Sequence, residues 1–157
     1  MNLKSYLSST QKRIAMPIMT HPGIEYIGKR VIDAVTDGDV HFEAIRAVVE
    51  RYNMAACNFP ENEVPHVIER LVADEASVSN LKVPDLTAGR LPEYLKANQR
   101  AVAYFQDRPV LAGCIGPFSL AGRLYDMSEI MVAIYIEPDT ILQLLEKCTT
   151  FLLAYFR

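Results

Sequence analysis

The eight-residue apolar segment PVLAGCIG, at residues 109–116, most constrains what this chain can fold into. Both faces of a β-strand over this segment would be apolar, which is typical of a parallel sheet covered on both sides. Gly116 and Pro117 end the segment, and helical spacing follows at once. Because a buried strand that turns directly into a helix is the repeating element of α/β proteins, we expect an α/β fold with a parallel sheet.

Two more segments are predicted to be buried strands. Residues 14–19 read IAMPIM and are followed by a turn signal, THPG, at residues 20–23. Residues 53–57 read NMAAC, and the polar, proline-containing stretch that starts at Asn58 is predicted to be a loop. Both segments are short, which suits strands better than helices.

Helices are predicted where apolar residues recur at spacings of three and four. The predicted helices cover residues 40–52, residues 91–106, a short stretch from residue 117, residues 128–135, and a last helix that begins at Pro138. Residues 66–73 fit a helix or a strand equally well, and residues 82–90 are predicted to be a loop.

Composition and charge exclude several classes of protein. With 50% apolar and 22% charged residues, the chain resembles neither a disordered nor a collagen-like sequence. Its net charge of -3 gives no reason to expect nucleic acid or an anionic membrane as a partner. Apolar runs are too short for a membrane helix or a signal peptide. Three cysteines without C-x-x-C spacing favour a reducing cytoplasm.

The last helix closes on FLLAYFR, residues 151–157, which is apolar on nearly every side. Exposed to solvent, such a turn would form an aggregation-prone patch. We therefore expect the natural protein to continue beyond Arg157; the alternative is that a partner chain covers this turn.

The turn after residues 109–116 is the most site-like feature, because ligands of α/β proteins lie at the carboxyl ends of the strands. Gly113 and Gly116 would let the backbone approach a ligand, and the free N–H groups of the next helix would favour an anion. Phe118 and Ser119 stand in the first turn of that helix. The alternative is tight packing of helix on strand that only small residues permit, and spacing does not decide between the two.

Two further residues are candidates for ligand contact. His21 occupies the equivalent place after residues 14–19, as a proton carrier, a ligand or a surface histidine. Arg123 follows the turn by one helical turn and is suited to hold a carboxylate or phosphate. The alternative for Arg123 is a surface ion pair with Asp126 or Glu129.

The other reactive residues are expected to be structural. His41 and His66 are predicted to lie on solvent-exposed faces, and Cys114 and Cys148 in the core, where cysteine behaves as a small hydrophobe. Cys57 stands at a strand end. No His-x-Cys or Cys-x-x-His pair exists, so we expect this chain alone to hold no metal. The acidic residues expected to form a solvated face are Glu61, Glu63, Asp74 and Glu75.

Two segments resemble the uroporphyrinogen decarboxylase superfamily, which includes cobalamin-dependent methyltransferases. They are PVLAGCIGPFSLAGRLYDM at residues 109–127 and EPDTILQLLEKCTTFLLAY at residues 137–155. Residues 13–45 and 59–71 are similar to the methyltransferase-like branch. The family fold is a (β/α)8 TIM barrel of about 250 residues. The resemblance therefore implies that residues 1–157 are a single partial domain, the N-terminal half of such a barrel.

The chain departs from the decarboxylases of this family at positions that carry their chemistry. Their arginine-rich motif, which holds substrate carboxylates, falls at residues 20–23, where this chain has no arginine. Arg123 takes the place of a tyrosine. Their catalytic aspartate lies in a segment that has no counterpart between Cys57 and Asn58. We expect either that the natural protein has a loop there that this sequence omits, or that the deletion is real.

The resemblance implies that the whole protein moves a methyl group between a corrinoid and a thiol, with zinc held by His and Cys beyond residue 157. The residues implied to contact the substrate or tetrapyrrole are His21, Gly113, Gly116, Phe118, Ser119 and Arg123, and the chain alone is expected to be inactive. One alternative is uroporphyrinogen III decarboxylase of porphyrin biosynthesis. Another is a non-catalytic module that binds a tetrapyrrole or pairs with a second chain. The implied partners are a tetrapyrrole or thiol substrate, a corrinoid protein and, as an open alternative, a second copy of the chain.

Overall fold

In a computed structural model, the described residues are 2–11, 13–16, 20–52, 54, 57–59 and 70–157. The chain divides into two compact units. The first unit combines Met1–Asn62 with Thr87–Cys114, and the second combines Glu63–Leu86 with Ile115–Arg157. Each unit is described by itself. Among the described residues, no helix has the length and apolar character to cross a bilayer.

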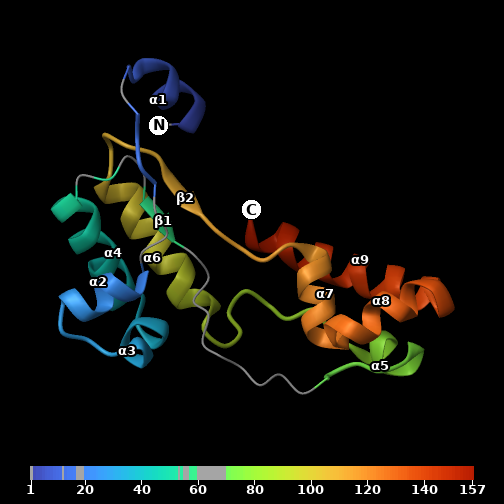
Figure 1. Cartoon of the computed structure of the whole chain (residues 1–157). Helices are drawn as coiled ribbons and strands as arrows, with labels where there is room; N and C mark the ends of the chain where they lie inside the picture. The colour runs from blue at the N-terminus through green and yellow to red at the C-terminus, as the bar shows by residue number, and fades with distance from the viewer. Residues whose placement is uncertain (1, 12, 17–19, 53, 55–56, 60–69) are drawn as a thin grey trace. The chain divides into compact units, whose positions relative to one another are not determined.

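The first unit holds five helices and two strands among its described residues (Figure 1). They are α1 (Leu3–Ser9), α2 (Thr20–Tyr26), α3 (Val31–Thr36), α4 (Gly38–Tyr52), β1 (Cys57–Phe59), α6 (Leu91–Tyr104) and β2 (Val110–Ala112). The two strands pair in parallel, with Cys57 opposite Val110 and Phe59 opposite Ala112. Parallel strands need a crossover connection, and the chain between β1 and β2 includes α6.

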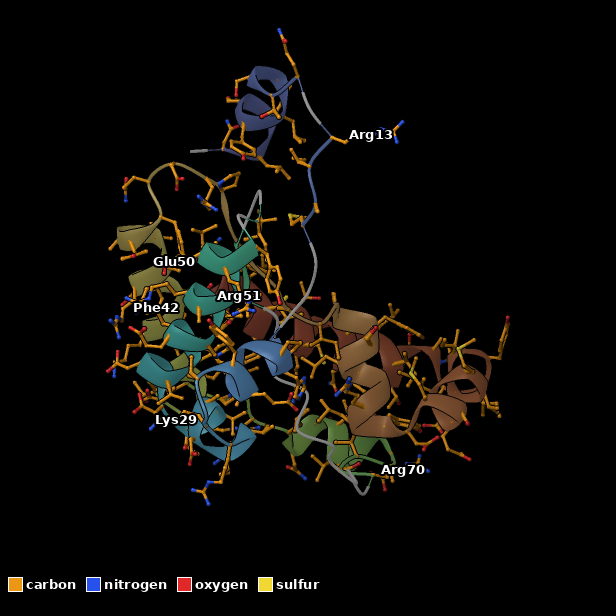
Figure 2. The ribbon with its side chains drawn as sticks, turned by 60° about the vertical axis from the view of Figure 1, so that its left-hand side comes forward. Arg13, Lys29, Phe42, Glu50, Arg51 and Arg70 are labelled. Carbon is orange, nitrogen blue, oxygen red and sulfur yellow. The ribbon has the colours of Figure 1, made fainter. Side chains whose placement is uncertain are left out.

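The core of the first unit lies between α4 and α6, which pack side by side. Phe42 and Ile45 of α4 are buried against Ala97 and Ala101 of α6, whose small side chains let the two helices approach closely. Polar contacts flank this apolar seam. Figure 2 shows Phe42 and Glu50 on the same helix, and Glu50 accepts a 2.6 Å hydrogen bond from the Tyr104 hydroxyl of α6.

Helix α2 packs on the other side of α4 through a glycine. A side chain at Gly23 would collide with the backbone carbonyl of Ala44 in α4. Ile24 and Ala34 are buried beside Ala44, so α2, α3 and α4 share a second, smaller cluster. The position of α2 therefore depends on a residue without a side chain.

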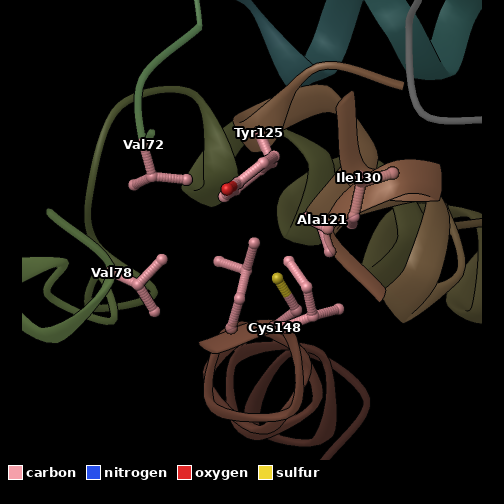
Figure 3. Close-up of a cluster of buried hydrophobic side chains, with 9 residues drawn as sticks. Val72, Val78, Ala121, Tyr125, Ile130 and Cys148 are labelled. Carbon is pink, nitrogen blue, oxygen red and sulfur yellow. The ribbon is translucent and has the colours of Figure 1, made fainter. Parts of the chain in front are cut away.

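The second unit is built from α5 (Glu75–Asn80), α7 (Pro117–Tyr125), α8 (Met127–Ile136) and α9 (Pro138–Tyr155). Its core gathers side chains from all four helices and from the segment before α5, as Figure 3 shows with Cys148 pointing from α9 into the cluster. The buried members are Val72, Val78, Ala121, Tyr125, Ile130, Ala133, Ile141, Leu144 and Cys148. Burial of this cluster supplies the hydrophobic stabilisation of the unit.

Two polar residues fix the helices of the second unit. Asp126 joins α7 to α8 with a φ of 84°, which non-glycine residues rarely adopt, and its carboxylate accepts hydrogen bonds from the Ser128 and Glu129 N–H groups. Lys147 of α9 donates hydrogen bonds of 2.7–2.8 Å to the carbonyls of Val78, Ser79 and Leu81. It thereby provides a hydrogen-bond donor to the carbonyls at the C-terminal end of α5.

The predicted helices are confirmed, with small changes at their ends. The helix predicted over residues 40–52 is α4, and the one predicted over residues 91–106 is α6. The helix predicted from residue 117 is α7, the one over residues 128–135 is α8, and the one from Pro138 is α9. Residues 82–90 form a loop as predicted. Of the ambiguous stretch 66–73, residues 70–73 are neither helix nor strand, and residues 66–69 lie outside the described residues.

The predicted strands need larger corrections. Residues 109–116 contain a strand only at Val110–Ala112, and it is half-buried rather than covered on both faces. The strand predicted over residues 53–57 is displaced to Cys57–Phe59, so Asn58 and Phe59 were wrongly predicted to be loop. Residues 14–16 have no regular structure, and residues 17–19 lie outside the described residues. The described part of the chain is thus a helix-rich α/β fragment with a short parallel pair.

The turn predicted at residues 20–23 is wrong, because these residues form the first turn of α2. Proline is tolerated in the first turn of a helix, where its missing N–H group would have no partner. Gly23 lies at the contact with α4 rather than at a bend. Proline and glycine, which usually indicate a turn, are here compatible with a helix.

The predicted exposure of His41 is also wrong, because its side chain is buried, with 1% of the residue exposed. Its ring packs edge-on against Tyr94 of α6, with 5.9 Å between ring centroids. Burial disfavours the charged imidazolium and lowers the pKa of His41 to about 4. His66 lies outside the described residues.

The lowered pKa of His41 predicts how stability changes with pH. The unfolded chain binds a proton near pH 6.5, whereas the folded chain binds it near pH 4. Stability is therefore full above pH 6.5 and falls as the pH drops toward 4, by roughly 3 kcal/mol for this group. Urea unfolding at several pH values should show this loss in the wild type and a smaller one in His41→Phe. Equal pH dependence of the two proteins would contradict the prediction.

Candidate functional site

Four of the predicted site residues lie on α7 or directly before it. Gly116 precedes the helix with extended backbone angles (φ -74°, ψ 158°), and Pro117 is the first helical residue. The Leu120 N–H group donates to the Gly116 carbonyl, and no side chain caps the start of α7. The N–H groups of Phe118 and Ser119 have no acceptor within the helix, so the start of α7 favours a negatively charged group.

Ser119 and Arg123 lie one helical turn apart, and both are exposed. Phe118 is 36% exposed in the same first turn. The opposite side of α7 is buried, because Ala121 and Tyr125 belong to the core of the second unit. Packing of this apolar side therefore turns the serine hydroxyl and the guanidinium outward together, as the predicted site requires.

Arg123 does not form the surface ion pairs considered as its alternative role. The Asp126 carboxylate caps α8, and the nearest cation to Glu129 is Arg70, at 3.8 Å. Within the described part of the second unit, Arg123 is in no ion pair. Its guanidinium thus remains available for a carboxylate or phosphate.

The two remaining predicted site residues belong to the first unit. His21 is an exposed residue in the first turn of α2, and Gly113 is half-buried just after β2. Among the six predicted residues, the structure brings together Gly116, Phe118, Ser119 and Arg123. Contact of any of the six with a ligand remains a prediction.

The cysteines differ in their surroundings. Cys148 is buried in the core as predicted, and burial raises the pKa of its thiol. Cys114 is half-buried in the loop after β2 rather than inside the strand, and Cys57 begins β1. No three His, Cys, Asp or Glu side chains of the described ranges lie together as a metal site would require.

The predicted acidic face is described only in part, since Glu61 and Glu63 lie outside the described residues. Asp74 and Glu75 are exposed at the start of α5, where the Asp74 carboxylate accepts a hydrogen bond from the Ser77 N–H group. The Ser77 side chain, and after it the Ser77 N–H group, lower the pKa of Asp74 by hydrogen bonding. The start of α5 could have been recognised in the sequence, because aspartate three residues before serine fits an N-terminal helix cap.

Comparison with known proteins gives one family and one fold. The sequence model described as Uroporphyrinogen decarboxylase (URO-D) matches residues 25–157. A solved methyltransferase from Methanosarcina mazei is similar over 98% of this chain and 52% of that one, with a TM-score of 0.80 and 18% identity. No curated protein sequence matches the chain. This chain therefore spans about half the length of a methyltransferase that shares its fold.

The surroundings of two glycines predict losses of stability of different size on substitution by alanine. Gly23→Ala should lower the free energy of unfolding by about 2 kcal/mol, because overpacking against a backbone carbonyl outweighs the better helix propensity of alanine. Gly116→Ala should cost less than about 1 kcal/mol, because no atom lies within 4 Å of the added carbon and only the cap is weakened. Thermal unfolding followed by circular dichroism measures both. A loss for Gly23→Ala no larger than for Gly116→Ala would show that α2 does not pack closely on α4.

Proposed function

Because the chain belongs to the uroporphyrinogen decarboxylase family, we propose that it forms the N-terminal half of a (β/α)8 barrel in a methyltransferase. The parent protein transfers a methyl group between a corrinoid and a thiol. The observation that carries this proposal is the likeness to a methyltransferase fold along 98% of the chain. The TIM barrel, the corrinoid and the thiol are parts of the proposal.

The residues at 20–23 support the methyltransferase over the decarboxylase. Decarboxylation of a uroporphyrinogen requires cations that hold the carboxylate side chains of the substrate. Residues 20–23 read Thr-His-Pro-Gly and start a helix, so no arginine stands there. A thiol acceptor has no such set of carboxylates and does not require this motif.

In the proposed mechanism this chain binds and orients the substrate. The Ser119 hydroxyl, the Arg123 guanidinium and the first N–H groups of α7 would hold an anionic group of the substrate or tetrapyrrole. Phe118 would contact its apolar part. Gly116 would let the ligand approach the backbone. Ligand contact of His21 and Gly113, which belong to the first unit, stays a separate prediction.

Zinc is expected in the parent protein, where it would convert the acceptor thiol to a thiolate. The described residues of this chain do not fit a zinc site, because they gather no three potential ligands. The proposal includes His and Cys ligands in a part of the parent protein outside this chain, and no step of the mechanism uses a metal on this chain.

The second candidate is uroporphyrinogen decarboxylase, which the description of the matching family favours. Two assays of the parent protein distinguish the two candidate functions. One incubates it with methylcobalamin and coenzyme M, and the other with uroporphyrinogen III. We expect methylated thiol, no carbon dioxide, and zinc at one equivalent per chain by atomic absorption. Carbon dioxide release from uroporphyrinogen without methyl transfer would overturn the proposal, and inactivity with both would leave a non-catalytic binding module.

Arg123 provides a test of how the substrate is held. In the parent protein, Arg123→Ala should raise KM for the anionic substrate about tenfold, with kcat changed by less than about twofold, because a charge-assisted contact is lost before the chemical step. Arg123→Lys should recover part of the affinity. Lys29→Ala, which removes an exposed cation of the first unit, is the control and should leave KM unchanged. An unchanged KM in Arg123→Ala would remove Arg123 from the site.

A further inference from the structure

The second unit contains a cavity of about 250 Å³ on the flank of α7 away from Ser119 and Arg123. Leu120 and Leu124 of α7 form one wall, and Cys148 and Phe151 of α9 form another. The segment of residues 81–84, which follows α5, closes the third side. None of the six predicted site residues lines this cavity.

The interior of the cavity offers almost only apolar surface. Leucine, valine, proline and phenylalanine side chains make up most of its lining. Lys147 also lines it, but its ammonium group donates to the carbonyls of Val78, Ser79 and Leu81 and is not available to a ligand. The cavity is partly open to solvent, and its apolar lining favours an apolar molecule over water.

The charged residues that line the cavity are all positive. Lys82 lines it from an exposed position, and within the described part of the chain Lys82 forms no ion pair. Lys147 adds a second positive charge, and no aspartate or glutamate is among the lining residues. A ligand that carries one negative charge therefore finds an unpaired cation next to an apolar interior.

We propose that this cavity binds a small amphipathic carboxylic acid. Its apolar chain fills the space between α7 and α9, and its carboxylate pairs with the Lys82 ammonium. The size is appropriate, because an apolar cavity of about 150 Å³ holds benzene, with six carbons, so this one has room for about eight to ten. The proposal goes beyond methyl transfer and does not depend on it.

A single tryptophan can report on binding, because the chain contains none. Phe151→Trp places the fluorophore in the lining of the cavity, whereas Phe156→Trp places it at the exposed end of the same helix, where Phe156 is 58% exposed. Octanoate is the probe, and 1-octanol is the uncharged probe of equal chain length. Circular dichroism establishes that each variant is folded before titration.

Octanoate should give a saturable change in the emission of Phe151→Trp and none in Phe156→Trp. Adding Lys82→Gln to Phe151→Trp should weaken octanoate binding about threefold, as expected for a partly exposed ion pair, and should leave 1-octanol binding unchanged. The control, Lys4→Gln in the same background, should change neither. Absence of saturation with octanoate in the folded reporter variant would overturn the proposal, and so would 1-octanol binding as tightly as octanoate.

A filling variant gives an independent test. Val83→Trp, at the exposed rim of the cavity, should abolish the protection by octanoate against thermal unfolding that the wild type shows. Leu142→Trp, on an exposed part of α9, should retain it. Equal protection of both variants would place octanoate elsewhere. Methyl transfer by the parent protein is a separate measurement, so failure of either proposal can be recognised without the other.

Discussion

The packing of α7 against α8 and α9 is the constraint on which the second unit depends. Ala121 and Tyr125 of α7 are buried with Leu144 and Cys148 of α9, and this contact fixes the rotation of α7 about its axis. Because a helix turns by about 100° per residue, burial of one side determines where the others point. The serine and arginine of the candidate site face outward, and the two leucines on the other flank line the cavity.

The helices could be predicted from sequence because their apolar spacing is regular, but His41 shows where that reading fails. His41, Ile45 and Val48 have the spacing i, i+4, i+7, so they share one face of α4, and all three are buried. The predicted solvent-exposed position of His41 is therefore wrong. The helical spacing by itself predicts burial of His41, whereas the residue type does not.

Elements that depend on distant contacts could not be predicted. Gly23 lies in a helix and leaves no room for a side chain beside the Ala44 carbonyl of α4, a contact that local sequence does not encode. Lys147 meets carbonyls more than sixty residues earlier in the chain, and the cavity beside it forms only when α5, α7 and α9 are assembled. The position of Arg123 one helical turn after Ser119, by contrast, follows from helical spacing after the predicted turn, and its contact with a ligand stays a prediction.

The two flanks of α7 differ in how they can bind an anion. At Ser119 and Arg123, which are exposed, a bound ligand would stay in water, so its charge would be screened and specificity would come from the number and direction of hydrogen bonds. In the proposed cavity site the apolar part of a ligand would leave water, so most of the binding energy would come from chain length and a smaller share from the charge at Lys82. A polar substrate and an apolar acid therefore do not compete for one surface, and one helix can present two sites of different selectivity.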